Sequence, residues 1–144
     1  FLDFDKIIPM PKALDITASF NTKETELEEK YKANLEEFGF QHWYDWRVAN
    51  WGTKWNSYDC NFTESGMCLV TAWSPPEPVI KELAKITGKT WVLEYMEEGE
   101  GFIGRFTASP EGVIDECYEL PNAPQDLKDS LGYEEWEEDE EELV

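Results

Sequence analysis

Apolar positions recur at helical spacing near the start of the chain and again near its middle. In the first such stretch the apolar residues lie four, four and three residues apart, on one helix face: Leu27, Tyr31, Leu35 and Phe38. This pattern predicts a helix that begins at Thr22 or Thr25 and stops before Gly39.

The second helical stretch follows a clear start signal. Ser74 is placed to cap the helix, Pro75 suits its first position, and Glu77 would complete a capping box. We expect this helix to run to about Thr87 before Gly88, with these residues on its buried side: Val79, Ile80, Leu83 and Ile86.

Shorter apolar or alternating runs predict strands. Residues 4–10 suggest a short extended segment, residues 43–48 a strand followed by a turn or bulge at residues 50–52, and residues 67–73 a central strand. Three more strands are expected at residues 90–96, 101–107 and 113–118, with turns between them. The order predicts an α+β fold, a mainly antiparallel sheet with two helices packed on one face.

The signal for ordered elements fades after Leu120. Residues 121–124 contain two prolines, and ten of the residues from 126 to 144 are acidic against one base, Lys128. We therefore expect one domain over residues 1–120, followed by a Pro-containing linker and an acidic C-terminal tail over residues 121–144.

Charge narrows the choice of partners. The chain of 144 residues has 32 acidic and 12 basic residues, a formal net charge of −20. About −11 of this belongs to residues 1–125, so the excess is not confined to the tail. Such a charge repels nucleic acid and anionic membranes and attracts basic surfaces. We expect no direct nucleic-acid or membrane binding.

The sequence offers no recognisable catalytic, metal or cofactor site. His42 is the only histidine, and the three cysteines (Cys60, Cys68 and Cys117) form no CxxC pair, so zinc lacks ligands. The G-x-G-x-x-G at residues 99–104 precedes a predicted strand instead of a helix, which indicates a hairpin turn. An odd cysteine count and an N-terminus without a signal peptide favour a reducing compartment, the cytoplasm of the cell that contains the protein.

Two features have both a structural and a functional interpretation. The Trp-rich segment 43–58 either fills the core or offers an aromatic recognition site at Trp51, Lys54 and Trp55. The acidity either keeps the protein soluble or imitates a polynucleotide, since carboxylates two apart on a strand have roughly the 6–7 Å spacing of successive phosphates.

Four short stretches together resemble a known family. They are, in order, residues 4–11 (FDKIIPMP), 50–55 (NWGTKW), 72–76 (AWSPP) and 97–104 (EEGEGFIG). They are similar to the phage- and plasmid-encoded family that includes the YubB proteins, over about residues 4–107. The resemblance implies a ferredoxin-like domain and a mobile-element origin, but no reaction and no established site.

Relatives usually carry a further strand and helix before the FDKIIPMP counterpart. Either this chain has been trimmed or its sheet is completed differently. A missing strand would leave an open sheet edge, through which homo-oligomers could form. The acidic tail lies outside the resemblance.

These observations support one functional hypothesis and one alternative. The first is a non-enzymatic inhibitor of a host defence or DNA-processing protein, which presents carboxylates to that protein's basic, nucleic-acid-binding surface. Its expected partner-binding residues are Glu134, Glu135, Trp136, Glu137, Glu138, Asp139, Glu140, Glu141 and Glu142. The alternative is a ligand- or peptide-binding module that uses the Trp-rich segment, with acidity serving only solubility.

Overall fold

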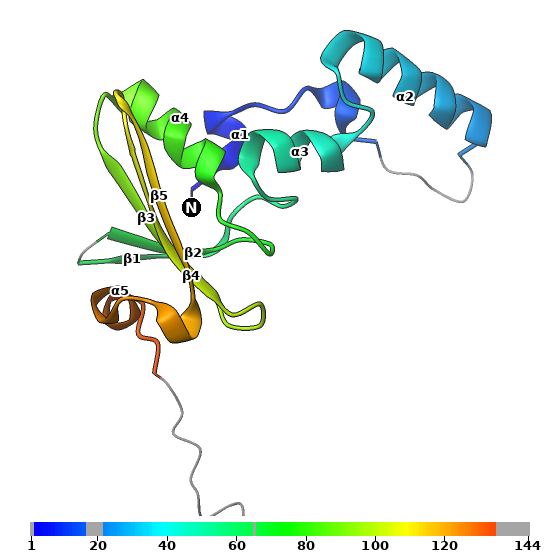
Figure 1. Cartoon of the computed structure of the whole chain (residues 1–144). Helices are drawn as coiled ribbons and strands as arrows, with labels where there is room; N and C mark the ends of the chain where they lie inside the picture. Colours follow the sequence, from blue (N-terminus) through cyan, green and yellow to red (C-terminus); the bar gives the residue numbers. More distant parts are fainter. Residues whose placement is uncertain (1, 17–21, 65, 135–144) are drawn as a thin grey trace, which may run out of the picture.

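The computed structural model describes residues 2–16, 22–64 and 66–134, which form two small antiparallel sheets with helices around them (Figure 1). No helix within these ranges is long and apolar enough to cross a membrane. The elements, in chain order, are α1 (Phe4–Ile7), η1 (Lys12–Leu14), α2 (Glu24–Phe38), α3 (Trp43–Trp51), β1 (Tyr58–Thr63), β2 (Gly66–Val70), α4 (Glu77–Thr87), β3 (Trp91–Glu97), β4 (Phe102–Ser109), β5 (Gly112–Glu119), η2 (Leu120–Asn122) and α5 (Gln125–Ser130).

The larger sheet has the order β3-β4-β5, and all its pairs are antiparallel. Its three strands fall within one or two residues of the predicted ranges. Phe106 and Ala108 on β4 join Ile80 and Ala84 of α4 in one core cluster. On the opposite face Ile103 is 0% exposed and packs with residues of η2 and α5. The predicted α+β class is confirmed, with α4 covering one face and α5 part of the other.

Helix α4 begins differently from the prediction. Its N-cap residue is Pro76, which makes no side-chain capping bond. The Ser74 hydroxyl instead donates to the backbone oxygen of Gly52, 22 residues earlier. Val79 and Ile80 are buried as expected, whereas Ile86, in the last turn of α4, is 62% exposed.

The predicted strand at residues 43–48 is wrong, because these residues begin helix α3. His42 caps the helix, its Nδ1 accepting from the Tyr44 amide at 3.3 Å, and Gly52 ends it in a left-handed conformation. Trp46 and Trp51 are buried. Tertiary packing of these two rings overrides the strand preference of aromatic residues.

Two other predictions at the sheet were also wrong. Residues 4–10 contain the short helix α1, capped by the Asp3 carboxylate, rather than an extended segment. Strand β2 is not central, since it pairs only with β1. The polar strand β1 was not predicted, because its residues lack an apolar alternation.

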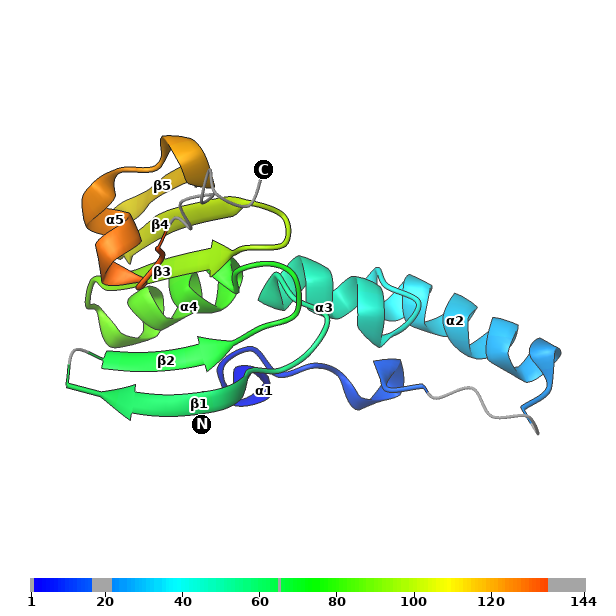
Figure 2. The same cartoon turned by 90° about the horizontal axis from the view of Figure 1, so that it is seen from below.

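Helix α2 forms as predicted, but the two figures show it extending away from both sheets (Figures 1 and 2). Leu35, on its expected apolar face, is 49% exposed. The buried residue of α2 is Asn34, whose side-chain amide donates to the backbone oxygens of Ala13 and Gln41 at 3.0 and 3.1 Å. These two bonds attach α2 to the segments before and after it.

The ordered domain continues past the expected boundary at residue 120. Leu120 is 5% exposed and Leu127, in α5, is 1% exposed, because both pack on Ile103. Residues 121–134 are therefore part of the domain and not a linker or tail. The remainder of the expected tail, residues 135–144, lies outside the described residues.

Candidate binding surfaces

A contact between two distant segments creates an aromatic surface. Gly52 packs so closely on the start of α4 that an added Cβ would lie 2.9 Å from the Pro75 oxygen and from Pro78 Cδ. Together with the Ser74 bond, this contact joins residues 50–55 to residues 72–78. Trp55 and Trp73 are 18 residues apart in sequence. Because of this contact, both rings lie beside the same lysine side chain.

The lysine is Lys54, which lies beside both rings. Its Nζ is 3.6 Å from the centroid of the Trp73 ring and 5.4 Å from that of Trp55. Trp73 is 71% exposed and has a φ of 65°, a backbone conformation that costs energy for a bulky residue. An exposed indole held in this conformation over a cation is a candidate recognition element.

Arg47 and Trp43 extend this surface toward α3. Trp43 stacks on Trp55 with centroids 5.4 Å apart. The Arg47 guanidinium lies 5.0 Å from the Trp43 centroid and 5.2 Å from that of Trp51, and its buried Nε has no hydrogen-bond partner among the described residues. Burial lowers the pKa of Arg47, against the opposing effect of Asp15 and Asp5. We call Trp43, Arg47, Lys54, Trp55 and Trp73 the aromatic cluster.

The three residues of the predicted aromatic site differ in their exposure. Trp55 is 46% exposed, and Lys54 beside it is half-buried. Trp51 does not lie at the surface, since it is 2% exposed and its indole nitrogen donates to the Ile8 oxygen at 2.9 Å. Trp43, Arg47 and Trp73 were missed. The proximity of Trp73 to Lys54 depends on a tertiary contact, so no local pattern could reveal it.

Carboxylates gather in the second half of the chain. Residues 91–134, which we call the acidic region, contain eleven acidic residues and two basic ones, Arg105 and Lys128. Lys128 is 7% exposed, so it offers little positive surface. Arg105 makes three ion pairs within this region.

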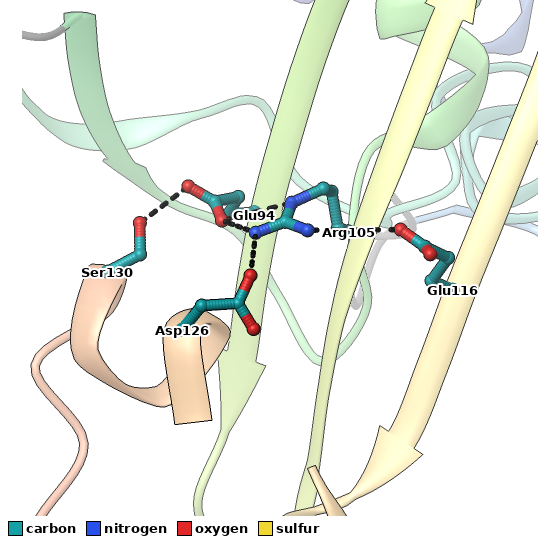
Figure 3. A network of polar contacts seen from close by, with 5 residues as sticks. All are labelled: Glu94, Arg105, Glu116, Asp126 and Ser130. Carbon is teal, nitrogen blue, oxygen red and sulfur yellow. Dashed lines mark hydrogen bonds and ion pairs between the residues drawn. The ribbon is translucent and has the colours of Figure 1, made fainter. Parts of the chain in front are cut away.

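Arg105, on the central strand β4, is shared by three carboxylates (Figure 3). Its Nη2 donates to Glu94 at 3.0 Å and to Asp126 at 3.4 Å, and its Nη1 lies 4.0 Å from Glu116. Ser130 of α5 donates to the other Glu94 oxygen at 2.6 Å. The bond to Glu94 raises the pKa of Arg105. This Arg105 network joins α5 to the sheet. Because it has three carboxylates and one guanidinium, its net charge is negative.

The other sheet face has a second group of acidic side chains. Tyr95 donates its hydroxyl to Asp115 at 3.2 Å. Burial, and then the nearby Cys117 and Asp115, raise the pKa of Tyr95. Burial, and then Asp115, raise the pKa of Glu77. No group of three or more possible metal ligands occurs within the described ranges.

Of the nine residues predicted to bind a partner, the structure describes Glu134, which is exposed beyond α5. The other eight lie outside the described residues: Glu135, Trp136, Glu137, Glu138, Asp139, Glu140, Glu141 and Glu142. The acidic region was not singled out in the sequence, although its excess of acids over bases is visible there.

The fold defines an α+β protein of the ferredoxin-like class with two candidate binding surfaces of opposite character. Residues 50–143 match the model of the family described as the ferredoxin-like domain in Api92-like protein, and the chain belongs to that family. No match was found among curated proteins or among solved structures. The matched region reaches residue 143. It therefore includes most of the acidic C-terminal residues, which lie outside the resemblance described from the sequence.

Proposed function

We propose that the protein is a non-enzymatic acidic binding protein of a phage or plasmid, acting in the host cytoplasm. It would bind the basic, nucleic-acid-binding surface of a host defence or DNA-processing protein and inhibit it by occupancy. The observation that supports this most is the charge of the acidic region, eleven acids against two bases on one folded unit.

The Arg105 network supports a retained negative surface. One guanidinium cannot neutralise Glu94, Glu116 and Asp126 together, and the three carboxylates stay 26%, 43% and 70% exposed. Among the described residues, the carboxylates at the end of β3 and in the turn after it make no ion pair. They are Glu97, which is half-buried, and the exposed Glu98 and Glu100. Unpaired exposed carboxylates of one sign speed encounter with a basic partner.

The test compares two triple substitutions with the same charge change. E97Q, E98Q and E100Q remove three charges beside the sheet, and E24Q, E26Q and E28Q remove three from the outer part of α2. Each variant is immobilised and exposed to the heparin-retained fraction of a host lysate, which is enriched in nucleic-acid-binding proteins. Bound proteins are identified by mass spectrometry at low and high salt.

We expect the turn variant to lose its bound proteins and the α2 variant to keep them. Binding by the unsubstituted protein should fall about tenfold or more between 50 and 200 mM salt if several charges are involved. Equal capture by both variants, or capture that does not depend on salt, would contradict the proposal.

A second function is favoured by the aromatic cluster. Its exposed Trp73 and Trp55 rings flank Lys54, which suits a planar, anionic ligand or an aromatic side chain of a peptide. Under this alternative the W73A and W55A variants lose binding while both acidic triples retain it. F62A, which changes an 81% exposed ring on β1 outside the cluster, is the control.

A further inference from the structure

The one histidine of the sequence caps helix α3 through a ring nitrogen. His42 is the N-cap residue, and its Nδ1 accepts from the Tyr44 amide at 3.3 Å. Helices are usually capped by the oxygen of a serine, threonine, asparagine or aspartate side chain. A histidine nitrogen can replace such an oxygen only while it carries no proton. The start of α3 therefore requires the neutral imidazole.

Helix α2 holds this histidine in place. Where α2 meets the start of α3 (Figure 2), the buried Asn34 side chain donates to the backbone oxygen of Gln41 at 3.1 Å. Gln41 is the residue directly before His42. Tyr31 of α2 contacts the imidazole, with ring centroids 5.5 Å apart. The cap is thus supported by a neighbouring helix and does not depend on α3 alone.

A second proton on the imidazole removes the cap. The neutral ring that accepts at Nδ1 has its hydrogen on Nε2, which lies 3.9 Å from the Asp45 carboxylate. A proton added at Nδ1 would face the N–H of Tyr44, so two donors would oppose each other. The ring would also become positive at the N-terminus of a helix, where the helix dipole disfavours a cation. Both effects favour fraying of the first turn of α3 when His42 is protonated.

Asp45 acts in the opposite direction, because its carboxylate attracts a protonated ring. The carboxylate side chain is 53% exposed, and an ion pair at such exposure contributes little because water screens it. Loss of an N-cap acceptor typically lowers the ratio of formed to frayed first turn about fivefold. The other neighbours of the imidazole are the tilted rings of Tyr31 and Trp43, at 5.5 and 6.5 Å, which carry no formal charge. The net effect of protonation is therefore a looser first turn.

Fraying there would disturb the aromatic cluster, because Trp43 is the first residue of α3. Its ring stacks on Trp55, with centroids 5.4 Å apart, and lies 5.0 Å from the Arg47 guanidinium. Trp46 and Trp51, later in the same helix, are buried and hold the rest of it in place. Loss of the cap would therefore release Trp43 from Trp55 while the remainder of α3 stays folded.

We propose that His42 is a proton-sensitive cap, by which the aromatic cluster is assembled at neutral pH and loosened in mildly acidic solution. Histidine is the side chain whose protonation ordinarily falls between about pH 5 and pH 8. The pH response follows from the cap and needs no bound partner. Its role in controlling binding rests on the second function proposed above for the aromatic cluster.

The first test measures hydrogen exchange of the Tyr44 amide by NMR, as a protection factor relative to an unstructured peptide at the same pH. Between about pH 8 and pH 5 we expect this factor to fall about fivefold in the unsubstituted protein. His42→Asn keeps a capping acceptor that does not titrate in this range, so its factor should stay constant; His42→Asp serves the same purpose. His42→Ala has no acceptor and should give a low factor at both pH values.

The second test follows Trp43 itself. Two stacked indoles couple their electronic transitions, which gives a paired circular-dichroism signal that a Trp43→Phe variant lacks. This signal should weaken over the same pH range in which the imidazole protons of His42 shift in the NMR spectrum.

Three results would overturn the proposal. They are a Tyr44 protection factor that stays constant while His42 titrates, an equal fall of that factor in His42→Asn, and a paired indole signal that does not change with pH. All measurements use the free protein, so a failure of the proposed binding function would leave them unaffected.

Discussion

The aromatic cluster and the acidic region lie in the same domain but are built by different forces. Residues 43–76 include five of the seven tryptophans and have a net charge of about −1, whereas residues 91–134 have a net charge of −9. The first depends on burial and on cations packed against rings. The second depends on strand register, with one arginine among three carboxylates. The two candidate surfaces are therefore built from different segments of the chain, so the residues of each can be changed separately.

The largest effect should come from the buried ring beneath the aromatic cluster. Trp51→Ala removes a ring that is 2% exposed and packs on Phe4, Trp46 and Arg47. We expect a loss of about 3–5 kcal/mol in the free energy of unfolding, measured by urea denaturation. Trp73→Ala, at an exposed ring, should cost less than about 1 kcal/mol. Equal losses would show that the cluster is not divided into a core and a surface.

The next effect tests how closely the acidic region is packed. At Gly104 an added Cβ would lie 2.3 Å from the Tyr95 ring and 2.7 Å from the backbone oxygen of Glu116. Gly104→Ala should therefore destabilise the protein by about 1–3 kcal/mol in urea denaturation. Gly112→Ala has no heavy atom within 4 Å of the new Cβ and is the control. If both substitutions were neutral, the Tyr95 ring would not be fixed over β4.

A smaller effect separates the two arginines by their response to salt. Arg105→Gln leaves three carboxylates without their shared cation and should cost about 1 kcal/mol at low salt, less at 1 M salt. Arg47→Gln should cost a similar amount that salt hardly changes, because Arg47 packs between two rings. Unfolding in urea at both salt concentrations provides the measurement. If 1 M salt reduced the stability cost of both substitutions equally, both arginines would act through charge.

The smallest effect concerns Glu77 at the start of α4. Burial and Asp115 raise the pKa of Glu77, so the folded state disfavours its ionised form. Stability is lost as the pH rises from the ordinary pKa of a glutamate through the raised one. In thermal melts from pH 4 to pH 8, Glu77→Gln should gain stability relative to the unsubstituted protein as the pH rises. Glu111→Gln, an exposed change of the same charge, should show no such gain.

Helices and strands whose spacing of apolar residues is typical of their type were predictable from the sequence. Strands β3, β4 and β5 and helices α2 and α4 are confirmed, because their spacing and their terminal glycines carry the information locally. Helix α3 was predicted as a strand, since Trp43, Tyr44 and Trp46 favour strands until they are packed against the rest of the core. Helix α5 was missed because Leu127 is its one apolar residue, so the sequence of this short helix has no apolar periodicity.

The candidate sites were less predictable than the fold. Lys54 and Trp55 are neighbours in sequence and were found, whereas Trp73 joins them only through the packing of Gly52 on α4. The Arg105 network depends on the register that aligns Glu94, Arg105 and Glu116 across three strands. That register cannot be read from one strand at a time.

The closeness of Trp73 to Lys54 gives the molecule an optical reporter of its own. The indole is 71% exposed and is attached one residue before Ser74, the residue that fixes Gly52. Any movement that separates α4 from the end of α3 would carry the ring away from the ammonium group and alter its fluorescence emission. The difference between the emission spectra of the unsubstituted protein and of a Trp73→Phe variant would then follow such a movement without an added label.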